Sequence, residues 1–287
     1  MAERLTDLVR AELAEPVDPR VSAMAGAIAA DFPGSARAVL FYGSCLRQSE
    51  LDGLMLDFYL IVSDYRDAYR GIWLKVANTL LPPNVFPFAH EGLAAKYAVL
   101  SEADFARLNG PEAGDVSVWA RFAQPSRLVW SADDLARDAA VAAVARAAPT
   151  LLSYAAPMAA GSDPLDIWRA GFALTYASEL RAERSDRSGS IVDTEPARYL
   201  RFAAATPVAP APRAEAAWKR FRRRGKLLTL LRLAKAATTF AGGADYLAWK
   251  INRHAGTRIQ VRPWQRRWPI VGALILLPRL FLRGAIR

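Results

Sequence analysis

Two short apolar runs on either side of a glycine-serine turn constrain the fold of this chain more than any other stretch. Ala38 to Tyr42 is β-prone and follows the breaker cluster Pro33-Gly34-Ser35, so it predicts a strand. Gly43-Ser44 ends that strand, and Leu56 to Val62 predicts a second one. Asp57 interrupts the second run thirteen residues beyond the serine. Because an unpaired charge in a buried strand is costly, this aspartate indicates a functional site.

The strand, turn and strand have the layout of a nucleotidyltransferase site. A glycine lets the backbone approach a ligand, and Ser44 offers a hydroxyl and an amide to a triphosphate. Asp57 is then the candidate metal ligand. The alternative is a buried hairpin whose turn happens to contain Gly-Ser. Most nucleotidyltransferases carry Asp-x-Asp on this strand, but the second position here is Tyr59, and Asp52 in the preceding loop is a weaker candidate for the missing acid.

Length and cysteine content set outer limits. A chain of 287 residues is long enough for two domains, each with its own core. Cys45 is the only cysteine, which excludes an intrachain disulfide and a cysteine zinc site and favours a reducing compartment. The first ten residues form a mixed-charge amphipathic pattern, typical of neither a signal peptide nor a transit peptide.

Charge is distributed unevenly along the chain. The formal net charge is +10, yet residues 213–287 hold 18 Lys and Arg against two acids, whereas the other 212 residues hold 20 bases and 26 acids. A basic tail on an acidic body indicates an anionic partner for the tail.

The apolar content of the tail favours a membrane as that partner. Its basic run includes Arg222, Arg223 and Arg224, and near the end Trp264 and Trp268 stand among further arginines. The apolar segment 268–282 is interrupted by proline and arginine and is too short to span a bilayer, so we expect a peripheral protein on the cytoplasmic face of the inner membrane. Stacked aromatics and arginines also bind nucleic acid, which we consider the lesser alternative, and a core helix is the third interpretation.

The order of predicted elements gives an α+β fold. We expect a nucleotidyltransferase-like domain at 1–130, in which flanking helices cover a mixed sheet, and a helical domain at 131–204. A Pro/Ala-rich linker at 205–212 and a basic, amphipathic, membrane-contacting region at 213–287 follow. Besides the two site strands, the predicted elements are helices at 21–31, 65–81, 133–148 and 165–180, strands at 84–88, 94–100 and 126–130, and a polar loop at 185–190.

Five motifs, in order, give the chain a resemblance to a known family, the mitochondrial phosphatidate cytidylyltransferases of the translocator assembly and maintenance type and their bacterial relatives. They are Tyr42-Gly43-Ser44 with Gln48 and Leu56-Asp57-Phe58; Lys96-Tyr97-Ala98-Val99-Leu100-Ser101; Ala120-Arg121-Phe122-Ala123-Gln124-Pro125; Tyr176-Ala177-Ser178-Glu179-Leu180-Arg181; and Lys235-Ala236, Phe240-Ala241-Gly242 and Tyr246 to Lys250. Glu179 stands where the family has aspartate, and Ala98 and Ser178 replace glycines.

The resemblance implies an enzyme of phospholipid biosynthesis that joins CTP to phosphatidic acid, releasing pyrophosphate and forming CDP-diacylglycerol with Mg²⁺ or another divalent cation. It implies catalytic roles for Asp57, Ser44 and Glu179, with Asp57 as the metal ligand. The nucleotide-binding residues that it implies are Tyr42, Gly43, Ser44, Lys96, Arg121 and Arg181. A nucleotidyltransferase with a soluble or RNA acceptor, or a non-catalytic protein of this fold at the membrane, remains an alternative.

Overall fold

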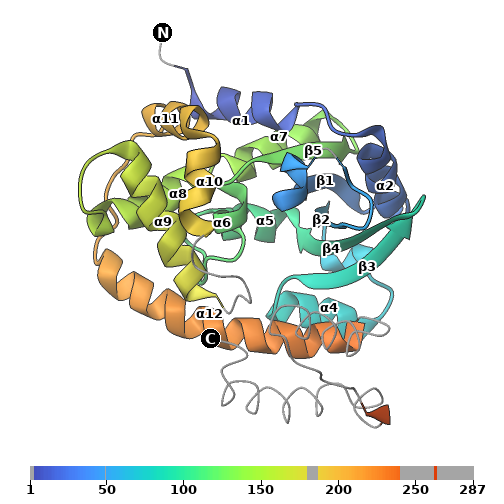
Figure 1. Ribbon diagram of the computed structural model, residues 1–287. Helices are drawn as coiled ribbons and strands as arrows, with labels where there is room; N and C mark the ends of the chain where they lie inside the picture. Colours follow the sequence, from blue (N-terminus) through green and yellow to red (C-terminus); the bar gives the residue numbers. More distant parts are fainter. Residues whose placement is uncertain (1–2, 49, 180–186, 240–261, 264–287) are drawn as a thin grey trace.

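The computed structural model describes residues 3–48, 50–179, 187–239 and 262–263. At its centre is a five-stranded sheet in the order β3-β4-β2-β1-β5 (Figure 1). The strands are β1 (Ala36–Tyr42), β2 (Met55–Val62), β3 (Asn84–His90), β4 (Leu93–Ser101) and β5 (Ser126–Ser131). Only β2 and β4 pair in parallel, and the other neighbours are antiparallel. The predicted mixed sheet with flanking helices is therefore confirmed, and each predicted strand is present with slightly longer bounds.

The two faces of the sheet have separate hydrophobic cores because strand side chains alternate. Phe41, Phe58 and Val99 point to the face that packs on helix α2 (Pro19–Ala30). Leu40 and Tyr59 point to the opposite face, which packs on the remaining core helices. These include α1 (Leu5–Leu13), α5 (Glu102–Asn109), α6 (Trp119–Phe122), α7 (Asp134–Val144), α8 (Ala147–Ala155), α9 (Pro164–Ser178), α10 (Arg187–Thr194) and α11 (Pro196–Ala204). The core on the face of Leu40 and Tyr59 continues without a break from the sheet into the helices after residue 131. The domain boundaries remain predictions.

The prediction of one continuous helix at 65–81 is wrong. The chain forms α3 (Tyr65–Ala68) and α4 (Ile72–Leu80), separated by an extended Tyr69. The Tyr69 ring is buried, with an edge contact to Phe32 and a tilted contact to Phe86. Burying this ring turns the chain out of the helix before Gly71, the N-cap of α4. The sequence signal at the break is Gly71, and it is a weak one because an isolated glycine costs a helix only about 1 kcal/mol.

Two further predictions in the helical region are corrected. The helix expected at 133–148 divides into α7 and α8, and the second continues to Ala155, where a short 3-10 turn (η2, Ala156–Met158) follows. The loop predicted at 185–190 is in part the start of α10, because Ile191 and Val192 are buried in the core and anchor a helix there. Residues 185 and 186 lie outside the described residues.

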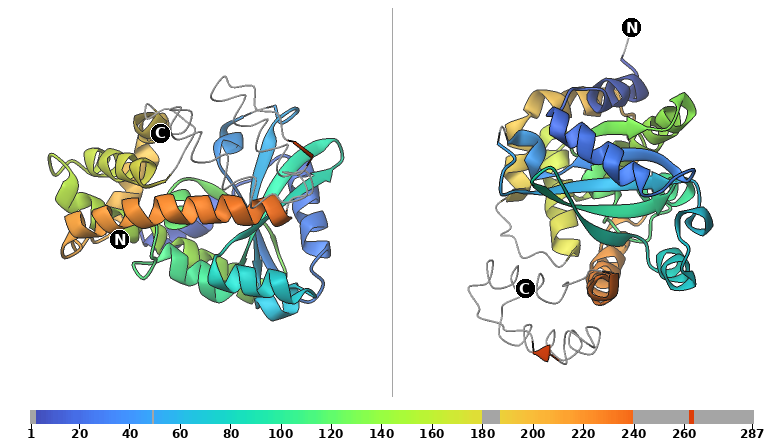
Figure 2. Two further views of the ribbon diagram at one scale, coloured as in Figure 1. Left: turned by 90° about the horizontal axis from the view of Figure 1, so that it is seen from below. Right: turned by 90° about the vertical axis from the view of Figure 1, so that its right-hand side faces the viewer.

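The basic region begins with the longest helix of the described part, α12 (Ala214–Thr239). It runs beneath both the helical layer and the sheet (Figures 1 and 2). Its inward stripe, Ala214, Trp218, Phe221, Gly225 and Lys235, is buried, and Trp218 and Phe221 have no exposed surface. The helix is therefore part of the folded body along one side.

One helical stretch within the described residues, Asp134–Met158, which comprises α7, α8 and η2, is long and apolar enough to cross a membrane. Its most apolar window is 56% buried inside the molecule. Core helices of soluble proteins meet the same criteria, so the stretch is weak evidence for a membrane span.

Candidate functional site

The predicted site residues of the sheet form a row across three adjacent strands. Asp57 lies directly opposite Tyr42 on β1 and directly opposite Lys96 on β4. Residues that pair directly across strands project from the same face of the sheet. Lys96 Nζ lies 2.8 Å from Asp57 Oδ1, and the two side chains keep 28% and 22% of their surface exposed. The strand aspartate is thus partly solvent-accessible and ion-paired.

The glycine-serine turn meets this carboxylate. Gly43 has a φ of +95°, a conformation that side-chain-bearing residues rarely adopt. A Cβ placed on Gly43 would lie 3.4 Å from Asp57 Oδ2, so the turn backbone and the carboxylate are close. Ser44 follows at the start of a short 3-10 turn (η1, Ser44–Arg47) and is exposed. The Gly43-Ser44 turn and the Asp57 carboxylate are therefore adjacent, on the same side of the sheet.

Two tyrosines form the inner wall of this row. The rings of Tyr42 and Tyr59 are 5.1 Å apart, and both pack against Phe122 of α6. Burial raises the pKa of the Tyr42 phenol well above its usual value, and the negative charge of Asp57 adds to the effect. Tyr59, at the place of the absent second acid, is 3% exposed and its pKa is also raised by burial. The Tyr59 side chain, two residues after Asp57 on the same strand, is therefore part of the core.

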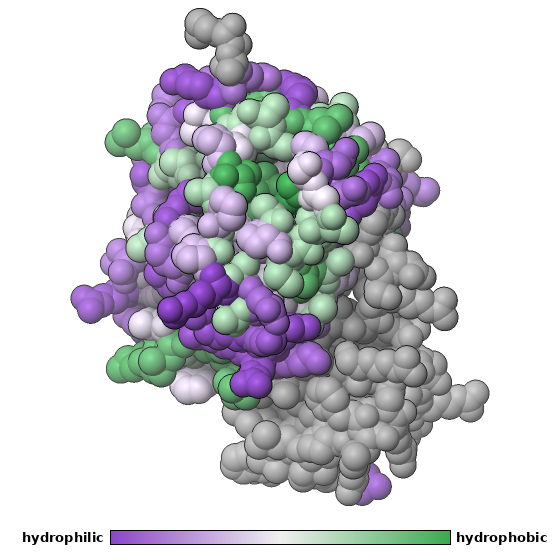
Figure 3. All heavy atoms as spheres, turned by 90° about the vertical axis from the view of Figure 1, so that its left-hand side faces the viewer, coloured by the Kyte–Doolittle hydropathy of each residue, from purple (hydrophilic) through white to green (hydrophobic). Residues whose placement is uncertain are grey.

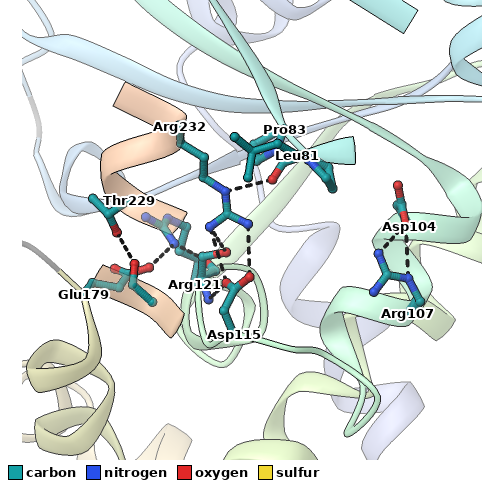
Figure 4. Close-up of polar contacts among 12 residues, drawn as sticks. Leu81, Pro83, Asp104, Arg107, Asp115, Arg121, Glu179, Thr229 and Arg232 are labelled. Carbon is teal, nitrogen blue, oxygen red and sulfur yellow. Dashed lines mark hydrogen bonds and ion pairs between the residues drawn. The ribbon is translucent and has the colours of Figure 1, made fainter. Parts of the chain in front are cut away.

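Arg121 and Glu179, 58 residues apart in sequence, form an ion pair beside the tyrosines. Arg121 Nη1 lies 3.2 Å from Glu179 Oε1 and also donates to the carbonyl of Ser117. The Glu179 side chain is only 9% exposed. Burial alone would lower the pKa of Arg121, but Glu179 and the two phenols outweigh it and hold that pKa well above its usual value. Figure 4 shows the pair at the end of α9, facing α12.

A second ionic group, which the sequence did not predict, connects α12 to this site. Arg232 Nη2 lies 3.0 Å from Asp115 Oδ2, its Nη1 donates to Ser117 Oγ, and its Nε donates to the Pro82 carbonyl (Figure 4). Burial would raise the pKa of Asp115, but the Arg232 charge outweighs it and holds that pKa below its usual value. Ser117 thus lies between two arginines, one from α6 and one from α12.

Lys235, one turn farther along α12, is also held by backbone carbonyls. Its Nζ donates to the carbonyl of Leu81 and, at 2.8 Å, to that of Pro83. Burial, with the nearby Arg232 charge, lowers the pKa of Lys235 to about 7. In sequence, Lys235 was part of the last family motif, Lys235-Ala236, whereas the only signal for Arg232 was the general excess of basic residues after 213.

Several predicted residues are not part of this group. Asp52 is exposed and pairs with Arg20 of α2 at 3.1 Å, so it does not join Asp57. The three arginines of the basic run, Arg222, Arg223 and Arg224, are exposed, and the guanidinium of Arg224 lies against Gly114. Arg181, Trp264 and Trp268 lie outside the described residues. Within the described ranges, no group of three or more His, Cys, Asp or Glu side chains is placed to hold a metal ion.

Comparison with known proteins identifies no family for this chain. No protein-family model matches the chain, and a search of curated proteins finds no match either.

Proposed function

We propose that this protein is a CTP:phosphatidate cytidylyltransferase, a membrane-associated transferase that forms CDP-diacylglycerol and pyrophosphate. The observation that carries the proposal is the contact between the Gly43 turn and the Asp57 carboxylate, in line with Tyr42 and Lys96 across three strands. A positive-φ glycine beside a strand carboxylate gives a triphosphate a backbone to lie on and its cation a ligand. The sequence motifs give the choice of CTP and phosphatidic acid.

The donor set fits a magnesium ion. Mg²⁺ is commonly bound through one or two carboxylates together with substrate phosphates, so Asp57 and a nucleotide suffice without a cluster of protein ligands. A bound Mg²⁺ would neutralise charge on the triphosphate and on the departing pyrophosphate.

The chain's own residues would bind and orient the substrates. Lys96 is placed to exchange its partner Asp57 for a phosphate of the nucleotide, and Ser44 offers its hydroxyl and amide to the same group. Arg121, fixed by Glu179 and by the Ser117 carbonyl, places a permanent positive charge beside Tyr42. The lipid phosphate would attack the α-phosphorus of CTP, and these groups would hold both reactants in line.

The test is transfer of cytidylate from CTP to phosphatidic acid, measured as CDP-diacylglycerol formed and pyrophosphate released. We expect Asp57→Asn to lose about a hundredfold or more in turnover, as is typical when a group that stabilises phosphoryl charge is removed. Asp52→Asn is the matched control, because Asp52 is an exposed acid of the preceding loop that pairs with Arg20. Equal activity of the two variants, or absence of product with the wild-type protein, would refute the proposal. Product with an RNA or soluble acceptor alone would support the other nucleotidyltransferase hypothesis.

A second candidate is a non-catalytic protein of the same fold at the membrane. The burial of Tyr59 favours it, because the usual place of the second acid is occupied by a core side chain. Under this hypothesis CTP binds, with an affinity that calorimetry can measure, and no pyrophosphate is released by either the wild type or the Asp57→Asn variant.

A further inference from the structure

The exposed side of helix α4 is apolar, whereas a surface helix of a soluble protein usually exposes its polar side. Its outward side carries Ile72, Trp73, Val76 and Leu80, which are 77%, 57%, 44% and 78% exposed. These positions lie within about a third of the helix circumference. Large apolar side chains gathered on an exposed helix face mark a surface that contacts something other than water.

The inward side of α4 is held by amide hydrogen bonds. Asn78 has no exposed surface, and its Nδ2 donates to the Val99 carbonyl at 3.0 Å and to Tyr69 Oη at 3.3 Å. Its Oδ1 accepts from the Asn84 backbone amide, and Asn84 Nδ2 donates to the Leu74 carbonyl. Because these bonds fix the rotation of the helix, the apolar side is held outward.

The basic side of α12 lies on the same side of the molecule. Both helices pack against β3, and both views in Figure 2 place them next to each other along the underside. A shallow groove along α12 is lined by Lys219, Arg220, Arg223 and Arg224. Figure 3 shows hydrophilic residues gathered low on the face where α12 begins. Leu227 and Leu231 add exposed apolar surface farther along the helix, at 57% and 46%.

We propose that α4 and the outward side of α12 form one surface that binds an anionic lipid membrane. The four apolar residues of α4 enter the acyl boundary, and the arginines and lysines of α12 contact the phosphate headgroups. The charge of α12 selects a membrane over an apolar protein partner, since an apolar stripe beside a dense basic face complements a layer of apolar chains under anionic headgroups. The choice of lipid rests on the proposed function, because phosphatidic acid is itself anionic.

This surface is adjacent to the candidate site. Arg232 and Lys235 on the inner side of α12 reach Asp115 and the loop that leads from α4 into β3, and Asp115 is linked through Ser117 to Arg121. The helix whose outward side contacts the lipid therefore also contributes, from its inner side, the two basic residues next to this cluster.

The first test is partition of the full chain into vesicles of phosphatidylcholine with phosphatidic acid, compared with phosphatidylcholine alone. We expect Trp73→Ser with Leu80→Ser to weaken binding to the anionic vesicles about a hundredfold, from the loss of two large apolar side chains that become buried on binding. Leu135→Ser with Leu200→Ser is the matched control, because both leucines are exposed, at 76% and 45%, on α7 and α11 at the far side from α12 (Figure 1). Equal loss in both pairs, or in neither, would overturn the proposal.

The second test reports on α4 directly and separates the membrane from coverage by the chain itself. An environment-sensitive fluorophore is attached at Trp73→Cys in a Cys45→Ala background, with Leu135→Cys as control. The proposal predicts a water-exposed emission that shifts to the blue when anionic vesicles are added, only at position 73. A probe already shielded before vesicles are added would mean that another segment or a second copy covers α4. Vesicle binding without cytidylyl transfer would refute the proposed function and leave this surface intact, so the two failures are distinguishable.

Discussion

Replacing Gly225 with alanine tests whether α12 is docked as closely as the structure shows. Gly225 faces the last turn of α9, and a Cβ at this position would lie 2.2 Å from the Ser178 carbonyl oxygen. That atom is backbone and precedes Glu179, so neither helix can accommodate the methyl group by a rotamer change. The contact must open, and α12 must move away from the end of α9.

Two opposing terms set the size of the effect. Alanine in a helix interior is favoured over glycine by about 1 kcal/mol. Overpacking a tight contact costs typically about 1–3 kcal/mol, so we expect Gly225→Ala to lie between neutral and about 2 kcal/mol destabilising. Gly26→Ala isolates the first term, because Gly26 lies within α2 with nothing within 4 Å of an added Cβ. The difference between the two variants is therefore the overpacking cost.

The assay is urea unfolding followed by circular dichroism, with limited trypsin digestion as a local probe. The basic residues of α12 are cleavage sites, so a loosened helix is cut faster in Gly225→Ala than in Gly26→Ala. If Gly225→Ala raised the unfolding midpoint as much as Gly26→Ala and was cut no faster, the close packing of α12 on α9 would be wrong.

Three further predictions concern the site and its surroundings. Gly43→Ala puts a side chain at a φ of +95° next to Asp57, and we expect about 1–3 kcal/mol lower stability and weaker CTP binding by calorimetry; unchanged affinity would contradict the role of the turn. Arg121→Met leaves Glu179 buried without its arginine and should cost about 3–5 kcal/mol in urea unfolding, partly restored by adding Glu179→Gln. Lys235 has a pKa of about 7 in the folded protein, below its unfolded value of 10.5. The unfolded chain therefore binds more protons than the folded one between these two pH values, so the free energy of unfolding rises with pH in this range, by at most about 1.4 kcal/mol per pH unit. The Lys235→Met variant should lack this rise in the same urea unfolding assay.

The strands of the site could be read from sequence because each is a short apolar run between breakers. The runs Ala38 to Tyr42 and Leu56 to Val62 gave both the strands and the period-two alternation that puts Asp57 on a defined face. The register that aligns Asp57 with Tyr42 and Lys96 followed from neither run. The antiparallel pairing of β1 with β2 aligns Asp57 with Tyr42. The parallel pairing of β2 with β4, which are separated by two helices and another strand, aligns it with Lys96.

Long-range ion pairs were beyond sequence reasoning for a different reason. Arg121 and Glu179 were both candidates, but nothing local indicates that they pair with each other across 58 residues. Arg232 resembled any other base in a basic tail, yet it binds Asp115, and the helix that carries it buries Trp218. The net charge of a segment is a property of all its residues together, so it does not show which few of them lie on the buried side of the helix.

The position of α12 has a consequence for biosynthesis. Trp218 and Phe221 complete a cluster of rings with Trp119 and Tyr154, and Trp218 Nε1 donates to the Tyr154 carbonyl. These partners are translated some sixty or more residues before α12, so a growing chain exposes an aromatic surface until α12 has left the ribosome. Nascent chains halted just ahead of residue 214 should therefore be strong ligands for a ribosome-associated chaperone, and those halted well past residue 239 should be released from it.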